Sequence, residues 1–421
     1  SVFEVAAQTG SNPTGMFGTS VHADEAQRVK HESSVVEFVN IDGFVRETET
    51  VTLEINAAVG DESVAIQRAG VVDSPSGELN IGSLDIVETV TGAVNAAIGY
   101  NTVAEQEVGS VINTGGDLNL GSVSITGVDT GQMNAALGAN TRAIMRVATI
   151  TGHVPGNFSA NSSTTLPINV TIGNRTESTM GLGYWEGDIR SSGTLVLESA
   201  GALAASIGDQ TTAYVGLANT GPASVLYGLD MTVMSEGALA APIGYASTAD
   251  ISLGEIMGTA ENGFTQMKVV TGPVLSASLG ANTSATNKVG HLAEGKRVGG
   301  RYRTDITTLA LLAFALGDNT NAINMIGSVE ADVGGNVDID ITIGEVMTGT
   351  VGVNTVAETI VGNVLSPVSG DVDIDIVVGG INSFAVGLST GKEIYSKTYV
   401  GNVWAPKSYA NIDIKHLGAI F

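Results

Sequence analysis

Two pairs of aspartates stand at alternate positions of apolar runs near the carboxyl end of this 421-residue chain. Asp338 and Asp340 form one pair, and Asp373 and Asp375 form another 35 residues later. Alternate residues of a strand share a face, so stacked strands would align these carboxylates in columns that a hard cation such as Ca²⁺ can bridge. We weigh calcium against a solvated acidic face and favour the acidic face, because the Gly-Gly-x-Gly-x-Asp repeat of calcium-binding β-rolls is absent. No other cofactor is expected.

The other side chains that could do chemistry are scattered. The chain has no Cys, which excludes disulfides, thiolate metal sites and cysteine nucleophiles. It also has no Gly-x-Ser-x-Gly elbow and no Walker lysine. We therefore expect no catalytic residues and no enzyme. The histidines are isolated in sequence, which favours solvated or capping roles over a metal centre; they are His22, His31, His153, His291 and His416.

The elements that would position the aspartates are short alternating runs of apolar and polar residues. This period of two is typical of strands with apolar side chains facing inward and Asn, Asp or Thr facing outward. Further examples are Leu79-Asn80-Ile81, Leu118-Asn119-Leu120 and Ile412-Asp413-Ile414.

One phrase recurs along the chain, with Asn95-Ala96-Ala97-Ile98-Gly99 as its type. We take its glycine as a marker, and successive markers are 35 to 39 residues apart except for one gap of 70, in which we place a degenerate copy near Gly183. The pattern predicts about ten imperfect repeats of 35–39 residues. The markers are Gly60, Gly99, Gly138, Gly208, Gly244, Gly280, Gly317, Gly352 and Gly387.

Repeats of this length and composition predict an all-β solenoid. Gly and Asn interrupt the pattern too often for helical repeats, and each repeat has room for roughly three short strands joined at glycine corners. A propeller blade is the main alternative, but such blades carry aromatic signatures and the chain has 2 Trp. Asparagines two residues after a marker would stack as amide ladders in such a solenoid; they are Asn101, Asn140, Asn282, Asn319 and Asn354.

Breaks in the rhythm divide the chain into five segments. We expect an N-terminal arm with the first strands at 1–50, which could pair with another subunit. Solenoid repeats follow at 51–152, an irregular insertion with a degenerate repeat at 153–200, further repeats at 201–387 and an aromatic-rich C-terminal rung or cap at 388–421.

Charge restricts the partners of this chain. Its formal net charge is −25, so nucleic acid and anionic membranes would repel it, and no apolar run is long enough for insertion as a membrane-spanning helix. Because the sequence starts at Ser1 with no Met, we expect a secreted protein from which a leader has been removed.

The repeat phrase resembles that of secreted fibril-forming proteins. Asn56-Ala57-Ala58-Val59-Gly60, followed by Ala65-Ile66-Gln67, is similar to the repeats of Fap-type functional amyloid subunits, and the likeness extends from Gly60 to Gly401. The phrase also resembles that of trimeric adhesin heads. Either resemblance implies an extracellular structural or adhesive protein.

Three functions are then weighed. The first is an extracellular structural protein whose rods join end to end into a homopolymeric filament or matrix fibre, because uncapped solenoid ends are open strand edges. The second is a cell-surface or phage adhesin that binds glycans through 153–200 or the C-terminus. The third is a polysaccharide-cleaving β-helix enzyme, which 18 Lys and Arg residues make the weakest of the three.

Overall fold

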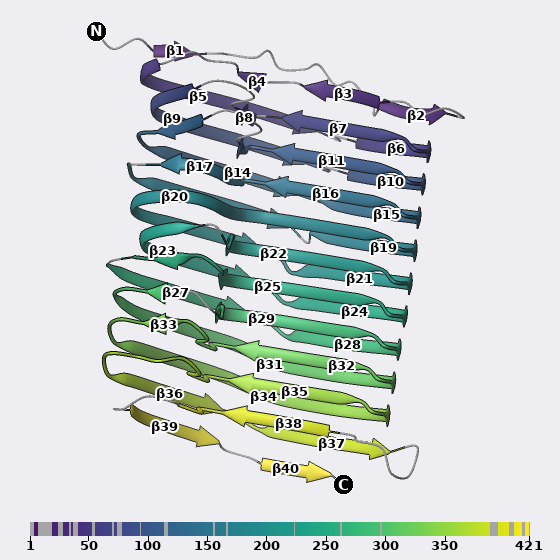
Figure 1. Ribbon diagram of the computed structural model, residues 1–421, viewed down its shortest axis with the longest axis vertical. Helices are drawn as coiled ribbons and strands as arrows, with labels where there is room; N and C mark the ends of the chain where they lie inside the picture. Colours follow the sequence, from purple (N-terminus) through teal and green to yellow (C-terminus); the bar gives the residue numbers. More distant parts are fainter. Residues whose placement is uncertain are drawn as a thin grey trace.

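The computed structural model is a stack of parallel coils, with the N-terminus at one end and the C-terminus at the other (Figure 1). It describes residues 4–6, 19–23, 28–32, 35–36, 41–52, 55–69, 71–73, 78–92, 94–112, 117–154, 156–165, 167–222, 224–261, 263–294, 297–387, 395–403, 408–414 and 417–420. Every element in these ranges is a strand, and all the strands belong to one 40-stranded sheet that winds around the stack. The described chain holds no helix suited to crossing a membrane.

Each coil has three main strand positions, which we call A, B and C. Position A holds β1 (Glu4–Ala6), β5 (Ile41–Thr52), β9 (Glu78–Thr91), β14 (Val123–Thr130), β18 (Phe158–Thr165), β23 (Val225–Ser235), β27 (Phe264–Thr271), β36 (Val372–Val378) and β39 (Ser408–Ile414). Position B holds β2 (Thr19–Ala23), β6 (Ile55–Asp61), β10 (Val94–Tyr100), β15 (Met133–Ala139), β19 (Ile168–Asn174), β21 (Ala202–Asp209), β24 (Ala238–Tyr245), β28 (Val274–Ala281), β37 (Ile381–Gly387) and β40 (Leu417–Ile420).

Position C runs back across the stack. It holds β3 (Arg28–Glu32), β7 (Val64–Ala69), β11 (Val103–Val108), β16 (Arg142–Val147), β22 (Thr212–Thr220), β25 (Thr248–Ile256), β29 (Ser284–Leu292), β32 (Asn321–Ile326), β35 (Val356–Val361) and β38 (Tyr395–Val400). Three long strands cover two positions each: β20 (Glu177–Ser199), β31 (Arg301–Asp318) and β34 (Val337–Val353). Shorter strands link C to the next A: β4 (Val35–Val36), β8 (Val71–Asp73), β12 (Val111–Ile112), β13 (Asp117–Leu120), β17 (Ile150–Val154), β26 (Thr259–Ala260), β30 (Arg297–Val298) and β33 (Asp332–Val333).

The coils stack in register, so equivalent residues of successive repeats form columns. Asn95 pairs with Asn134 and Gly99 with Gly138, and the same alignment continues from β6 to β37. The prediction of an all-β solenoid is therefore confirmed. Repeats of nearly equal length make this register possible, because each coil returns to the height of its neighbour after 35 to 39 residues.

The structure corrects the position of the degenerate repeat. Gly173, rather than Gly183, stands in the marker column between Gly138 and Gly208. Gly183 belongs to a second corner, where Gly109 and Gly254 also have φ near +60°. Segment 153–200 is likewise no irregular insertion, since β18, β19 and β20 pair with the coils on both sides, with one register shift against β23 between Ile189 and Ser192.

The outer segments contribute strands to the first and last coils. Strands β1 to β4 pair with β5 to β8, and β38 to β40 pair with β35 to β37. Of the aromatic residues expected at the C-terminus, Trp404 and Phe421 lie outside the described residues, whereas Tyr399 is 38% exposed.

The core changes character across each coil. Between A and C it consists mainly of Val, Ile, Leu and Met side chains, each of which contributes about 1.5–3 kcal/mol on full burial, with Phe158, Trp185 and Tyr302 among them. Toward the corner between B and C it narrows to small side chains, such as the alanine cluster that includes Ala97, Ala104 and Ala136. At this corner two sheets approach closely enough to exclude larger residues.

The marker glycines are required by this corner. Gly99 has a φ of +135° and Gly138 a φ of +130°, a region that L side chains rarely adopt. A Cβ atom on Gly138 would lie 2.0 Å from the carbonyl oxygen of Gly99 in the coil before it. The predicted corner glycines Gly60, Gly208, Gly244, Gly280, Gly317 and Gly352 share this conformation.

Position B does not follow the expected orientation of its side chains. In β10, Asn95 and Ala97 are buried, whereas Ile98 is 38% exposed. The residue before the marker faces outward in every coil from β6 to β37. This column is Val59, Ile98, Leu137, Ile172, Ile207, Ile243, Leu279, Leu316, Val351 and Val386.

Candidate functional site

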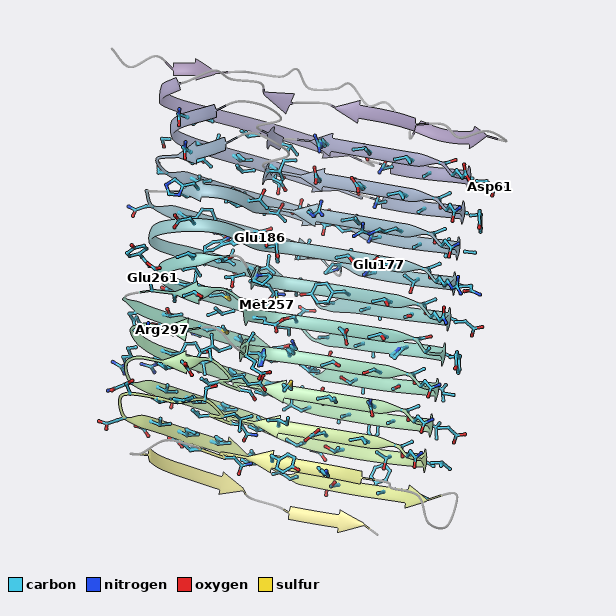
Figure 2. The ribbon with its side chains drawn as sticks, in the orientation of Figure 1. Asp61, Glu177, Glu186, Met257, Glu261 and Arg297 are labelled. Atoms are coloured by element: carbon cyan, nitrogen blue, oxygen red, sulfur yellow. The ribbon has the colours of Figure 1, made fainter. Side chains whose placement is uncertain are left out.

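Polar side chains follow the columns of the stack rather than gathering in one cleft (Figure 2). Asp61 lies at the edge where B and C meet, and Arg297 lies at the opposite edge. The candidate sites are therefore columns or short clusters within them.

The predicted asparagine ladder forms hydrogen bonds at the C-terminal end of its column. Asn319 Nδ2 donates to Asn282 Oδ1 over 3.1 Å, and Asn354 Nδ2 donates to Asn319 Oδ1 over 3.0 Å. All five predicted asparagines have φ between +51° and +56°, which Asn tolerates better than most residues. For Asn101 and Asn140 the structure gives main-chain hydrogen bonds, from their N–H groups to Ala139 and Asn174 in the next coil.

A second asparagine ladder, which the sequence analysis did not predict, is buried in the core of position B. Asn56 donates to Asn95 over 2.7 Å, Asn95 to Asn134 over 2.8 Å and Asn134 to Asn169 over 3.0 Å. The same amides also donate across the core to carbonyl groups of position C, for example from Asn95 to Ile144 over 2.8 Å. The ladder ends at Asn169 because Ala204 takes the next place in the column.

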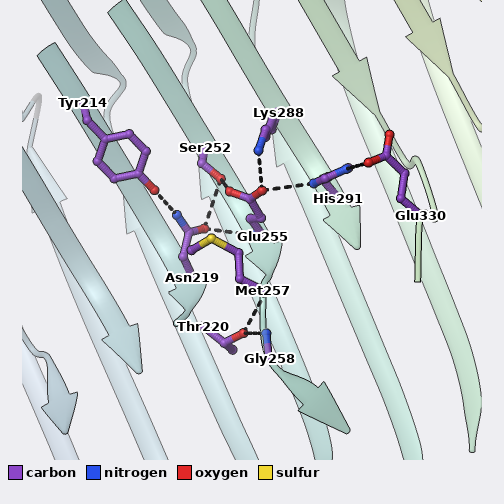
Figure 3. Close-up of polar contacts among 10 residues, drawn as sticks. All are labelled: Tyr214, Asn219, Thr220, Ser252, Glu255, Met257, Gly258, Lys288, His291 and Glu330. Carbon is purple, nitrogen blue, oxygen red and sulfur yellow. Dashed lines mark hydrogen bonds and ion pairs between the residues drawn. The ribbon is translucent and has the colours of Figure 1, made fainter. Parts of the chain in front are cut away.

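A buried polar cluster occupies the second corner of β22, β25 and β29 (Figure 3). Glu255 is at its centre and is 2% exposed. Its carboxylate accepts hydrogen bonds from Lys288 Nζ at 2.6 Å and Ser252 Oγ at 2.9 Å, and Nδ1 of His291 lies 3.0 Å away. Nε2 of His291 lies 3.5 Å from a carboxylate oxygen of Glu330. The imidazole is thus held between two carboxylates.

The charges of this cluster stabilise one another. Burial opposes the charged form of Glu255, but His291 and Lys288 outweigh it and lower the pKa of Glu255 to about 2. Burial also opposes protonation of His291, yet the hydrogen bonds to Glu255 and Glu330 raise its pKa above the ordinary value. The expectation of a solvated or capping histidine is therefore wrong for His291, which is 3% exposed.

The geometry of the cluster suits a structural role. Ser252 is buried and donates to Glu255 rather than to His291, and the lowered pKa of Glu255 makes its carboxylate too weak a base to activate a nucleophile. The remaining partners extend the network: the N–H of Glu255 donates to Asn219 Oδ1 over 2.8 Å, and Asn219 donates to the Tyr214 hydroxyl over 2.9 Å. The cluster joins four coils through side chains.

A buried acid lies in the core between β9, β14 and β18. Asp129 is fully buried, and burial raises its pKa to about 7, although the neighbouring Ser162 side chain acts in the opposite direction. Gln132 and Thr164 are buried nearby, with Thr164 Oγ1 donating to Gln132 Oε1 over 3.4 Å.

The aspartates considered for calcium lie on the outer side of position A. Arg301 pairs with Asp338 at 2.9 Å, and Arg303 pairs with Asp340 at 3.1 Å. Burial and the neighbouring Asp338 raise the pKa of Asp340. Across the described ranges, no three His, Asp or Glu side chains converge in a metal-binding arrangement. Asp373 and Asp375, which follow Asp338 and Asp340 in the same two columns, are exposed.

A shallow polar groove of about 580 Å³ crosses position A on β9, β14, β18 and β20. Hydroxyl groups of Ser122, Ser124, Ser159 and Thr194 line it together with Asp85, whereas the ring of Phe158 is buried against Trp185. A row of hydroxyls can form hydrogen bonds with a sugar, and part of this groove falls in segment 153–200.

Comparison with known proteins gives no relative of this chain. No family model, no curated protein and no solved structure matches it. The functional argument therefore rests on the fold and on the columns of stacked side chains.

Proposed function

We propose that the protein is an extracellular structural protein whose stacks join end to end into a filament or matrix fibre. The observation that carries the proposal is the match between the two ends of the stack. Within the described chain, β2 and β3 at one end and β40 and β38 at the other are paired on one side only, and they belong to the same positions, B and C. Open strand edges pair readily with other strands.

The two edges differ, so their contact is head to tail. Such a heterologous contact does not close on itself unless it is bent into a ring, and a straight stack of coils therefore extends into a filament. The internal columns, including the asparagine ladders, support a rod that transmits load along its axis. The protein needs no cofactor for this role, and its partner is a second copy of itself.

The terminal strand β38 provides a test at a single residue. The N–H of Gly401 donates to Val361 in the preceding coil, and alternate residues of a strand direct their N–H groups to the same side. The N–H of Thr398 therefore points away from the stack. Thr398→Pro removes that donor while leaving the pairing with β35 intact, and Thr398→Ala is the matched control that keeps it.

Electron microscopy and sedimentation of the purified chain give the result. We expect filaments for the unaltered chain and Thr398→Ala, and shorter filaments or assemblies one stack long for Thr398→Pro at an unchanged melting temperature. Single rods for the unaltered chain at high concentration would refute the proposal.

The groove on position A favours a second candidate, a glycan-binding adhesin. Ser159 and Thr194 supply the exposed hydroxyls that would contact the sugar. A glycan array with the unaltered chain and Ser159→Tyr, which fills the groove, tests this function. Binding lost in the variant supports it, and no binding by either protein rejects it.

A further inference from the structure

The outer side of position B is an apolar surface along the stack, which we call the aliphatic face. It consists of the residues one, three and five positions before each marker glycine, and Ile98, Ala96 and Val94 are its members in β10. From Val94 to Val386 none of these positions holds Lys, Arg, Asp or Glu. A chain with a net charge of −25 thus keeps one whole face free of charge.

The aliphatic face is open to solvent. Ile207 is 39% exposed, Ile243 is 41% exposed and Leu279 is 43% exposed, although large apolar side chains usually lie inside a protein. Scattered exposed apolar residues are ordinary, but a contiguous patch larger than a few hundred Å² marks an interaction site. The described chain packs no other element over this face (Figure 1).

The aliphatic face has two ridges with a groove between them. The columns one and five before the marker carry large aliphatic side chains, whereas the column between them is mostly alanine, as at Ala241 and Ala277. The groove closes toward the C-terminal end, where the rings of Phe314 and Phe384 lie 6.3 Å apart over Gly349. The groove therefore runs along the seven strands from β6 to β28 and is narrowed at β19, where Val170 takes the place of alanine.

We propose that this face binds the same face of a second copy, so that two stacks lie side by side. A two-fold axis along the stack places the Ile243 ridge of each copy in the alanine groove of the other, and the two sheets then interdigitate as in packed β-sheets. Both stacks point in the same direction in this arrangement. It is independent of end-to-end joining, and it makes a filament two stacks wide.

Area and charge support a second copy as the occupant. Seven strands about 4.8 Å apart and about 20 Å long give roughly 700 Å² per copy, or about 1,400 Å² in total, within the range of stable protein interfaces. Charged residues such as Asp209 and Asp318 stand only at the rim, where interfaces are polar. Position A, by contrast, carries exposed aspartates that oppose contact between two copies.

Lysine substitutions test the proposal on the full chain. Ile207→Lys combined with Ile243→Lys places two charges on adjacent coils of the aliphatic face. The matched control is Met234→Lys with Val270→Lys, because these residues are each 37% exposed, pair with each other and lie on position A. Thr398→Pro is included in every chain to separate side-by-side pairing from end-to-end joining.

Sedimentation measures the outcome. We expect the parent and the control to sediment at twice 42.7 kDa and the Ile207→Lys/Ile243→Lys chain to sediment at 42.7 kDa with an unchanged circular dichroism spectrum. A parent that stays at 42.7 kDa, or one that instead attaches to phosphatidylcholine vesicles through this face, would overturn the proposal. If the unaltered chain forms no filaments but the Thr398→Pro chain still forms pairs, end-to-end joining is rejected and side-by-side pairing is supported.

Single cysteines test the direction of the pair, because the natural chain has none. In parallel stacks Ala96→Cys cross-links to itself and Ala277→Cys cross-links to itself through a short bis-maleimide. The control Asn321→Cys, exposed on position C, does not cross-link. Cross-links that form only when the Ala96→Cys and Ala277→Cys chains are mixed contradict the parallel arrangement.

Discussion

Replacement of Asn134 by Ala tests whether the buried ladder holds the coils in register. Asn134 is fully buried and donates through Nδ2 to Asn169 Oδ1, to the Ala143 carbonyl and to the Thr179 carbonyl, each over 3.0 Å. Its Oδ1 accepts from Asn95 Nδ2 over 2.8 Å. Because Nδ2 carries two hydrogens, these contacts amount to two full donated bonds and one accepted bond, and alanine removes all three.

The expected cost follows from this count. A buried hydrogen bond contributes about 1 kcal/mol net, so the loss of three destabilises the coil by about 3 kcal/mol. The small cavity left by the amide acts in the same direction. Asn174→Ala is the control, since Asn174 is exposed and a surface substitution changes stability by about 0.5 kcal/mol or less.

Hydrogen exchange followed by mass spectrometry is the assay, because coils contact only their neighbours and a defect opens the stack locally. About 3 kcal/mol corresponds to roughly 150-fold faster exchange. We expect that increase in β15 and the adjacent β10 and β19, with little change in β35. Equal exchange in the Asn134→Ala and Asn174→Ala chains would refute the reasoning.

Three further predictions follow from the corner, the cluster and the acidic columns. Gly138→Ala should lower the unfolding midpoint in guanidinium far more than Gly131→Ala. A Cβ added to Gly138 would lie 2.0 Å from the Gly99 carbonyl oxygen, whereas a Cβ added to Gly131 would lie 3.6 Å from its nearest neighbour. Equal shifts would contradict the packing argument. The contribution of His291 to stability is full below pH 6.5 and is lost as the pH rises through its raised pKa. The contribution of Glu255 is full above pH 4.5 and is lost as the pH falls toward about 2. His291→Gln should therefore flatten the alkaline side of a curve of stability against pH, and an unchanged curve would show that the imidazolium does not stabilise the fold. Chelation of calcium with EDTA should leave the unfolding midpoint unchanged, because the Asp338 carboxylate already pairs with arginine; a lower midpoint would indicate a bound cation.

The fold could be predicted from the sequence because its repeat is regular. Marker glycines recur at nearly constant spacing, and only a stack of coils uses such spacing to bring like residues together. The copy at Gly173 was missed because Val170-Thr171 stands where most copies have two small residues. Thr171 nevertheless is fully buried at the narrow corner, so the position accepts a hydroxyl as well as a methyl group.

The polar features were harder to predict. The repeat phrase itself begins with the asparagine of the buried ladder, but the rule that apolar residues face inward assigns Asn95 to the surface and Ile98 to the core. The corner between B and C reverses that rule, since it has room only for small residues and for amides that bond to one another. The aliphatic face is the outer consequence of the same reversal.

The cluster around Glu255 could not be predicted from the sequence. Glu255 and His291 are 36 residues apart and meet only because the coil that separates them returns in register. A coil one residue longer would turn one side chain away from the other. Nothing in the local sequence of an isolated histidine signals such a partner.

Cryo-electron microscopy of the purified full chain tests the central claim most directly. The account predicts long filaments in which coils continue across subunit boundaries with an axial spacing of about 4.8 Å, and in which β40 of one copy pairs with β2 of the next. Solitary rods, or filaments whose subunits touch through other surfaces, would contradict it.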